Sequence, residues 1–380
     1  MSRRYLIIFL GGLLWAATVH GAPPDQGSPA SLVSSLKIQG ALDFCGERVP
    51  LEVQEVRERL EKELLLTLWD RPQVILWLKR SRRYLPPIEA ILAKHGMPED
   101  IKYIAIAESA LRPHAGSGKG AIGFWQFMKS TGQKYGLTIN ARIDERRNLS
   151  ASTEAAVRYF KKLHQALGSW SLVAAAFNMG EDGMMAEILE QGTRNYYDLY
   201  LPLETQRFLF RILSVKLIFS DPRKYGFELG DEEHYPPLEI DSIQVECSHE
   251  TPIRIVAEAA GTSFKVIKDL NPEIRGHYLA PGSHRILLPK GASARFMERY
   301  KGLVAKHLSL REERIYIVRE GDNLSSIAAK FELPLGALMI WNRLDLSRPI
   351  HPGDRLVIHG KQATGGEGAD EDKEGRSEKD

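Results

Sequence analysis

An apolar helix that ends in an acidic residue is predicted for residues 98–108, which read PEDIKYIAIAE and are followed by Ser109. Counting back from Glu108 at helical spacing gives Ala105, Ile104 and Ile101, so its carboxyl group shares the apolar face. Burial and the partly negative C-terminal end of the helix both disfavour an ionised carboxylate. A carboxyl group that stays protonated near neutral pH is what a general acid for glycosidic cleavage requires. The alternative is a buried Glu that is hydrogen-bonded to a neighbouring loop.

Two later stretches suit an acetamido sugar. Residues 115–123 contain four glycines and form a loop whose backbone can approach a ligand, and residues 124–127, FWQF, add aromatic side chains and an amide. Residues 175–180, AAFNMG, end a helix of small residues at the amide of Asn178. Each stretch alone is weak evidence, because such loops and helices usually serve packing. Their order after Glu108 is the informative feature.

Taken in order, Glu108-Ser109, GAIGFWQF and AAFNMG resemble the three-part signature of the soluble-lytic-transglycosylase family. The similarity covers roughly residues 84–220. It implies a helical catalytic domain with the goose-type-lysozyme-like fold. It also implies cleavage of the β-1,4 bond between N-acetylmuramic acid and N-acetylglucosamine, with closure of a 1,6-anhydro ring and Glu108 as the catalytic group. The residues implied in sugar binding are Ser109, Gly123, Phe124, Gln126 and Asn178.

The chain departs from the family pattern at Phe208, where the family often has a tyrosine near the catalytic Glu. Either another donor substitutes or the rate is lower, and Tyr196, Tyr197 and Tyr200 are close in sequence. A hydrolase of the same bond, a muramidase, stays open, since it would need a second carboxylate. The candidates for that group are Asp144, Glu145, Glu181 and Glu204. A peptidoglycan-binding protein without catalytic activity is the remaining alternative.

A duplication is indicated in the C-terminal third, where an ungapped shift by 71 positions places Ile253 on Leu324 and Asn271 on Asn342. Each copy is predicted as strand, helix, helix, strand. The second copy resembles a LysM module, which binds glycans that contain N-acetylglucosamine. The groove residues that this resemblance implies are Gly321, Asp322, Asn323, Leu324 and Ile350. The first copy has Glu250-Thr251-Pro252 instead of Gly-Asp-Asn, so we expect it to be a scaffold.

The predicted fold class is therefore a mainly α, goose-type lysozyme-like catalytic domain followed by two small α+β (βααβ) LysM-type modules. Helices are predicted at 52–68, 72–79, 88–94, 124–135, 152–167, 170–178 and 203–219. The predicted parts are a signal peptide 1–21, a linker 22–45, the catalytic domain 46–230, a degenerate LysM-like module 243–290, a helical spacer 291–313, a LysM module 314–360 and a disordered tail 361–380.

The N-terminus predicts the compartment, because Arg3 and Arg4 precede an apolar run with small residues at its end. No cysteine follows that run, so we expect a protein of the periplasm or cell envelope without a lipid anchor. Cys45 and Cys247 are few enough to exclude a disulfide scaffold, and either a pair or two independent thiols stays open.

The composition and motifs of the sequence limit the classes of binding partner. The 51 Lys and Arg residues nearly balance the 49 Asp and Glu residues, which argues against a nucleic-acid binder. The sequence shows no helical His pair with a carboxylate at metal-ligand spacing, so no metal is predicted, and no cofactor motif is present. The predicted partner is the glycan strand of peptidoglycan. Peripheral association with a membrane stays open, and no protein partner is predicted.

Overall fold

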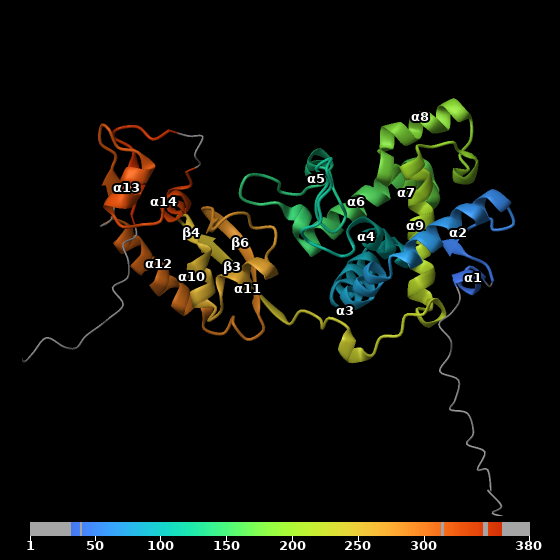
Figure 1. Cartoon of the computed structure of the whole chain (residues 1–380), viewed down its shortest axis with the longest axis horizontal. Helices are drawn as coiled ribbons and strands as arrows, with labels where there is room; N and C mark the ends of the chain where they lie inside the picture. The colour runs from blue at the N-terminus through green and yellow to red at the C-terminus, as the bar shows by residue number, and fades with distance from the viewer. Residues whose placement is uncertain (1–31, 39, 313–314, 345–348, 359–380) are drawn as a thin grey trace, which may run out of the picture. The chain divides into compact units, whose positions relative to one another are not determined.

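The computed structural model describes residues 32–38, 40–312, 315–344 and 349–358 (Figure 1). In these ranges the chain is mainly helical and carries four two-stranded sheets. Its contacts divide it into two compact units, one within residues 1–81, 98–107 and 160–235, the other within 82–97, 108–159 and 236–380. The predicted signal peptide and C-terminal tail lie outside the described residues.

The first unit is held together by one long helix, α9 (Leu203–Ser220), which contacts both α2 (Gln54–Trp69) and α7 (Trp170–Met179). Most of its apolar residues are buried, and a Glu63–Arg207 ion pair of 2.6 Å joins α2 to α9. The predictions for 52–68, 170–178 and 203–219 are confirmed to within two residues. We did not predict α8 (Glu181–Gln191), whose mixed small and charged residues give only a weak helical pattern.

A short helix and a hairpin form the first described elements of this unit. The strands of the hairpin are β1 (Asp43–Phe44) and β2 (Glu47–Arg48), and the helix α1 (Leu32–Ser35) precedes them. The carboxylate of Glu47 accepts hydrogen bonds from the Ser169 hydroxyl at 2.9 Å and the Ser171 amide at 3.0 Å, so it caps the start of α7. The stretch predicted as a linker therefore contains folded residues.

Residues 72–79 and 88–94 are helical as predicted, but the break predicted between them is wrong. Both stretches belong to one helix, α3 (Arg71–Lys94), which continues through Pro86 and Pro87. Proline removes a helical donor, but Leu85, Ile88 and Leu92 are buried along this helix, and their packing outweighs that loss. In the predicted helix 124–135, only α5 (Lys129–Lys134) forms.

The remaining helices of the catalytic region begin close to where the pattern predicts them. After α3, a 3-10 turn (Glu99–Ile101) leads into α4 (Lys102–Ser109), the helix that ends at Glu108-Ser109. The helix α6 (Leu149–Leu167) begins three residues before the predicted start, because the Asn148 side chain accepts a hydrogen bond from the Ala151 amide at 2.9 Å and caps it.

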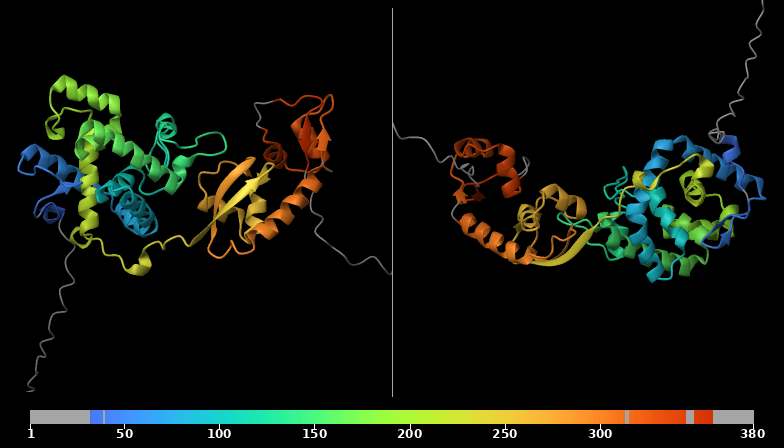
Figure 2. Two further views of the ribbon diagram at one scale, coloured as in Figure 1. Left: turned by 180° about the vertical axis from the view of Figure 1, so that it is seen from behind. Right: turned by 90° about the horizontal axis from the view of Figure 1, so that it is seen from below.

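The first C-terminal module has the predicted strand, helix, helix, strand order. Its strands β3 (Ile240–Cys247) and β6 (Gly282–Pro289) pair antiparallel along their whole length, and α10 (Ile253–Ala259) and α11 (Phe264–Leu270) lie beside them (Figures 1 and 2). The helix α12 (Phe296–Glu312) follows and contacts α10.

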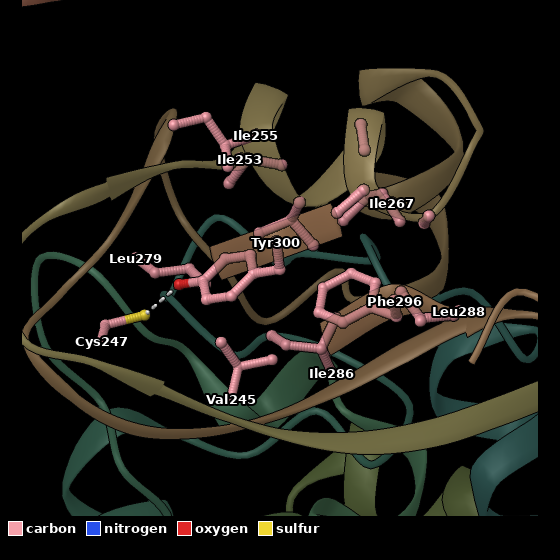
Figure 3. Packing of buried hydrophobic residues seen from close by; sticks show 14 of the residues in the cluster. Val245, Cys247, Ile253, Ile255, Ile267, Leu279, Ile286, Leu288, Phe296 and Tyr300 are labelled. Carbon is pink, nitrogen blue, oxygen red and sulfur yellow. Dashed lines mark hydrogen bonds between the residues drawn. The ribbon is translucent and has the colours of Figure 1, made fainter. Parts of the chain in front are cut away.

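The core of this module gathers side chains from every one of these elements. Figure 3 shows Phe296 and Tyr300 of α12 beside Val245 and Ile286 of the strands. The Tyr300 hydroxyl lies 3.3 Å from the Cys247 sulfur. Both cysteines of the chain are free thiols in the structure.

The second module repeats the arrangement with β7 (Ile315–Ile317), α13 (Leu324–Lys330), α14 (Leu335–Asn342) and β8 (Arg355–Val357). The Asn342 side chain accepts from the Val357 amide at 2.6 Å and donates to the Val357 carbonyl at 2.9 Å. In the first module Asn271 bonds both backbone groups of Leu287 in the same way, each at 2.8 Å. These matching side chains support the predicted duplication.

Among the described helices, none is by itself long and apolar enough to cross a membrane; the bent pair formed by α13 and α14 meets that criterion only by combined length and composition.

Candidate active site

Glu108 stands at the end of α4, as the next-to-last residue of the helix, and it is half-buried. Ser109 ends the helix and is 2% exposed. The next two residues, Ala110 and Leu111, have left-handed φ values of 54° and 57°. Such a conformation costs a non-glycine residue about 1–3 kcal/mol and is concentrated at functional sites. This turn ends the helix directly after Glu108, and no glycine in the sequence predicts it.

The loop that follows is tied together by Gln126. Its side-chain nitrogen donates to the Ala115 carbonyl at 3.1 Å and to the Gly123 carbonyl at 2.8 Å. Gln126 itself has a left-handed φ of 48°, and this turn breaks the helix that an apolar pattern predicts there. The side-chain nitrogen is therefore occupied in holding the loop, and the side-chain oxygen is the polar atom left to meet a ligand.

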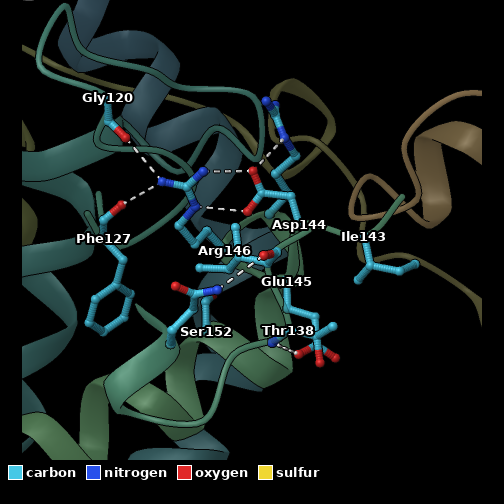
Figure 4. Close-up of polar contacts among 12 residues, drawn as sticks. Gly120, Phe127, Thr138, Ile143, Asp144, Glu145, Arg146 and Ser152 are labelled. Atoms are coloured by element: carbon cyan, nitrogen blue, oxygen red, sulfur yellow. Dashed lines mark hydrogen bonds and ion pairs between the residues drawn. The ribbon is translucent and has the colours of Figure 1, made fainter. Parts of the chain in front are cut away.

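Arg146 is the centre of the loop, although it is not among the predicted site residues (Figure 4). Its guanidinium is buried and forms two bonds to the Asp144 carboxylate, at 2.8 and 2.9 Å. It also donates to the carbonyls of Gly120 at 3.0 Å and Phe127 at 3.1 Å. Arg146, itself held by the ion pair with Asp144, thus fixes both ends of the 120–127 loop. A planar guanidinium with several N–H donors suits this bridging role.

Gly123 lies against the backbone of the same arginine. A Cβ atom at Gly123 would lie 1.7 Å from the Arg146 carbonyl oxygen, far inside van der Waals contact. The φ of 86° is also one that L-residues avoid. Glycine is therefore required at this position by two independent constraints.

The Asp144–Arg146 pair makes stability depend on pH. Burial alone would raise the pKa of Asp144, but the hydrogen bonds and charge of Arg146 outweigh burial and hold the pKa below its ordinary value. The stabilisation is complete above the unfolded pKa of about 3.9 and is lost as the pH falls through the lower folded value. We expect Asp144→Asn to lower the thermal midpoint by a constant amount from pH 7 to about 5, and by less below about 4. Parallel wild-type and variant curves down to pH 3 would contradict this assignment.

The other predicted residues have different surroundings. Phe124 is 2% exposed and its ring lies 5.3 Å from that of Tyr84, so it is a core contact in the structure. Its predicted role as a wall of the sugar site stays a prediction. Asn178 belongs to the first unit, at the end of α7, where its side-chain oxygen accepts from the Thr205 hydroxyl at 2.8 Å. This bond leaves the Asn178 NH₂ group to donate elsewhere.

The four carboxylates that the sequence left open as a second catalytic group all have structural partners. These are Arg146 for Asp144, the Thr138 amide for Glu145 at 2.6 Å, Lys162 for Glu181 at 3.0 Å and Arg211 for Glu204 at 3.1 Å. These contacts are those of loop and helix supports.

The tyrosines near Phe208 also differ from one another. Phe208 is buried at 1% exposure. The Tyr196 hydroxyl donates to the Gln206 carbonyl at 3.0 Å, and Tyr200 is 81% exposed. Burial raises the pKa of Tyr197 to about 12.

The sequence of this chain matches known proteins over the region of the candidate active site. The Transglycosylase SLT domain model matches residues 86–199. Membrane-bound lytic murein transglycosylase D of Escherichia coli (strain K12) is 31% identical over 330 residues, which cover 83% of this chain and 72% of that protein. The chain belongs to this lytic transglycosylase family. A putative tributyltin chloride resistance protein of Alteromonas sp. (strain M-1) is 30% identical over 117 residues, 30% of this chain and 56% of its own.

Two solved lytic transglycosylases give weaker matches. The match to an inactive mutant of Slt from Pseudomonas aeruginosa has a TM-score of 0.30 at 20% identity. The matched region covers 40% of this chain and 26% of the Slt chain. The match to the 70 kDa soluble lytic transglycosylase of Escherichia coli has a TM-score of 0.30 at 18% identity. The matched region covers 46% of this chain and 29% of that chain.

The C-terminal modules match two further family models. Residues 316–359 match the LysM domain, and residues 239–305 match the LysM-like domain of lytic transglycosylase MltD. Among the described residues, no three His, Cys, Asp or Glu side chains gather where they could hold a metal ion.

In the LysM module, the predicted groove loop is held by its own side chains. The Asp322 carboxylate accepts from the Tyr316 hydroxyl at 2.7 Å and from the Arg319 amide at 2.8 Å. The Tyr316 hydrogen bond lowers the pKa of Asp322, which keeps the carboxylate ionised. The Asn323 side chain caps α13 by accepting from the Ser326 amide at 2.9 Å. Both polar side chains shape the loop, so its backbone is the part free to meet a sugar.

Proposed function

We propose that the protein is a peptidoglycan lytic transglycosylase in which Glu108 alone serves as acid and then base. The observation that carries this is Glu108 at the sharply turned end of α4, ahead of a loop that Arg146 and Gln126 hold rigid. Membership of the lytic transglycosylase family supports the reaction type. A rigid loop of this kind fits a site that must hold a sugar in one pose for reaction.

In the proposed reaction, Glu108 first donates its proton to the oxygen that leaves C1 of N-acetylmuramic acid. The C1–O bond breaks, and the sugar's own acetamido group stabilises the positive charge on C1. The carboxylate of Glu108 then removes the proton from the C6 hydroxyl of the same sugar, whose oxygen bonds to C1. Glu108 is protonated again at the end of the reaction, no water is consumed, and the product ends in a 1,6-anhydro ring.

The competing function is a hydrolase of the same bond, which would place a second carboxylate near the sugar. The structural partners of Asp144, Glu145, Glu181 and Glu204 favour the single-carboxyl route. Digestion of purified sacculi in water enriched in heavy oxygen separates the two. We expect no label in the muramoyl ends that are released; stoichiometric label at C1 would make the protein a muramidase.

We further propose that Ser109, Gln126 and Asn178 position the sugar, and that the LysM module holds the enzyme on the wall. The side-chain nitrogen of Gln126 is used within its own loop, so its side-chain oxygen offers an acceptor for the N–H of an acetamido group. Export to the cell envelope through residues 1–21 is part of this proposal. A mature protein that begins near residue 22 in an envelope fraction is the expected result.

The LysM part of the proposal predicts the effect of Asp322→Ala. Loss of this carboxylate releases Tyr316 and the Arg319 amide, so the 321–324 loop loses its fixed shape. We expect weaker retention on sacculi in a pelleting assay, by several-fold, with the release of product at saturating sacculi unchanged. Glu320→Ala, at a neighbouring exposed carboxylate, is the control. Retention equal to the wild type in Asp322→Ala would remove this loop from wall binding.

A further inference from the structure

In the first C-terminal module, a strand pair closes the loop that corresponds to the predicted groove of the LysM module. At the duplicated positions, β4 (Thr251–Pro252) pairs antiparallel with β5 (Tyr278–Leu279), so backbone hydrogen bonding closes the loop. Ile253 is 0% exposed, whereas its counterpart Leu324 is half-buried. Ile350, the counterpart of Leu279, is also half-buried. A glycan would have to break a strand pair to enter the first module.

The same module instead pairs with a loop of the catalytic region. The Asp144 amide donates to the Glu273 carbonyl at 2.8 Å, and the Arg275 amide donates to the Arg142 carbonyl at 2.7 Å. These bonds flank an antiparallel bridge between Ile143 and Ile274. A segment of the module thus adds a short strand contact to residues 142–144.

Side chains strengthen this junction. Ile143 packs against the hydrophobic core of the module, in which Ile274 is 3% exposed. The Asn148 side chain donates to the buried Glu273 carboxyl group at 3.0 Å, and Arg142 forms an ion pair of 2.6 Å with Glu250. Apolar burial and polar side-chain bonds accompany the backbone pairing, so the contact is built from three independent kinds of interaction.

The junction reaches the candidate active site through one residue. Arg146 lies two residues after Asp144 and donates to the carbonyls of Gly120 and Phe127. Its own carbonyl fills the space beside Gly123. Contacts that hold residues 142–144 in place therefore also hold Arg146, whose hydrogen bonds position the 120–127 loop (Figure 4).

We propose that the first module is a brace for the active site: by pairing with residues 142–144 it positions the 120–127 loop, and it binds no glycan. The residues that do this are positioning residues, Ile143 and Ile274 above all. The proposal rests on the proposed lytic reaction and extends it.

A disulfide across the bridge is the first test. The two flanking hydrogen bonds make Ile143 and Ile274 a non-hydrogen-bonded pair, for which Cα atoms lie about 4.5 Å apart, within the range that a disulfide spans. We expect full-length Ile143→Cys/Ile274→Cys to keep wild-type product release when oxidised, with each single variant as control. An oxidised enzyme that is inactive until it is reduced would mean that the module must leave, and would overturn the brace.

The second test loosens the junction with Ile143→Asp. We expect product release to fall about tenfold, as a misplaced loop would cause, and the amides of residues 120–127 to exchange hydrogen faster. Retention on sacculi should stay at the wild-type level. Leu189→Asp, which introduces the same acidic side chain at a position that is 75% exposed, should leave product release, hydrogen exchange and retention unchanged.

The outcomes separate the two proposals. Unchanged exchange and release in a folded Ile143→Asp protein would overturn the brace, and so would lost wall retention, which would make the module a glycan binder. Hydrogen exchange needs no activity, so it tests the brace even if the wild type releases no anhydro product. That last result would instead contradict the proposed function.

Discussion

Glu108→Gln is expected to abolish release of anhydro-muropeptides while the fold and the retention on sacculi persist. Glutamine matches the size of Glu108 but can neither donate a proton to the leaving oxygen nor accept one from the C6 hydroxyl. General acid–base catalysis contributes up to about 10⁴-fold in rate, and here one group performs both steps, so we expect a loss of about a thousandfold or more. The rate of release from purified sacculi measures it.

Glu145→Gln is the matched control, because this half-buried carboxylate accepts from the Thr138 amide and supports the loop there. We expect it to keep most of the activity. Substantial turnover by Glu108→Gln, or a comparable loss in Glu145→Gln, would place the acid on another residue.

Gly123→Ala should be nearly as damaging, although it removes no chemical group. The new Cβ would lie 1.7 Å from the Arg146 carbonyl oxygen, and the φ of 86° disfavours any side chain. Either the loop or the arginine must shift by about an ångström or more, and a displacement of that size can cost about a hundredfold in rate. The expected result is product release about a hundredfold below the wild type, together with a lower thermal midpoint.

Gly118→Ala, two residues before this loop, is the control, since no heavy atom lies within 4 Å of the position that its new methyl group would take, and its φ is not left-handed. It should behave as the wild type. Equal activity in Gly123→Ala and Gly118→Ala would show that the Arg146 contact does not position the loop.

Periodicity was sufficient to predict the parts of the site that depend on local sequence. The spacing Ile101, Ile104, Ala105 places Glu108 at the end of a helix, and the structure has α4 end there. The shift that aligns Asn271 with Asn342 predicts the two modules. In the structure each of these side chains bonds the backbone of the last strand of its own module.

The supports of the site depend on contacts between distant residues, and sequence patterns do not carry these. Arg146 reads as an ordinary surface charge, and only the fold brings Asp144, Gly120 and Phe127 to it. The apolar run at 124–127 fits a helix by pattern, but the bonds of Gln126 to Ala115 and Gly123 hold it as a loop. No local signal pairs Ile143 with Ile274.

The mass of the muropeptides that the wild-type protein releases from purified sacculi tests the central claim most directly. Ring closure without water predicts products lighter by one water than the hydrolytic ones, with no muramoyl end that borohydride can reduce. Products with reducible muramic acid ends would contradict the single-carboxyl route and make the protein a hydrolase.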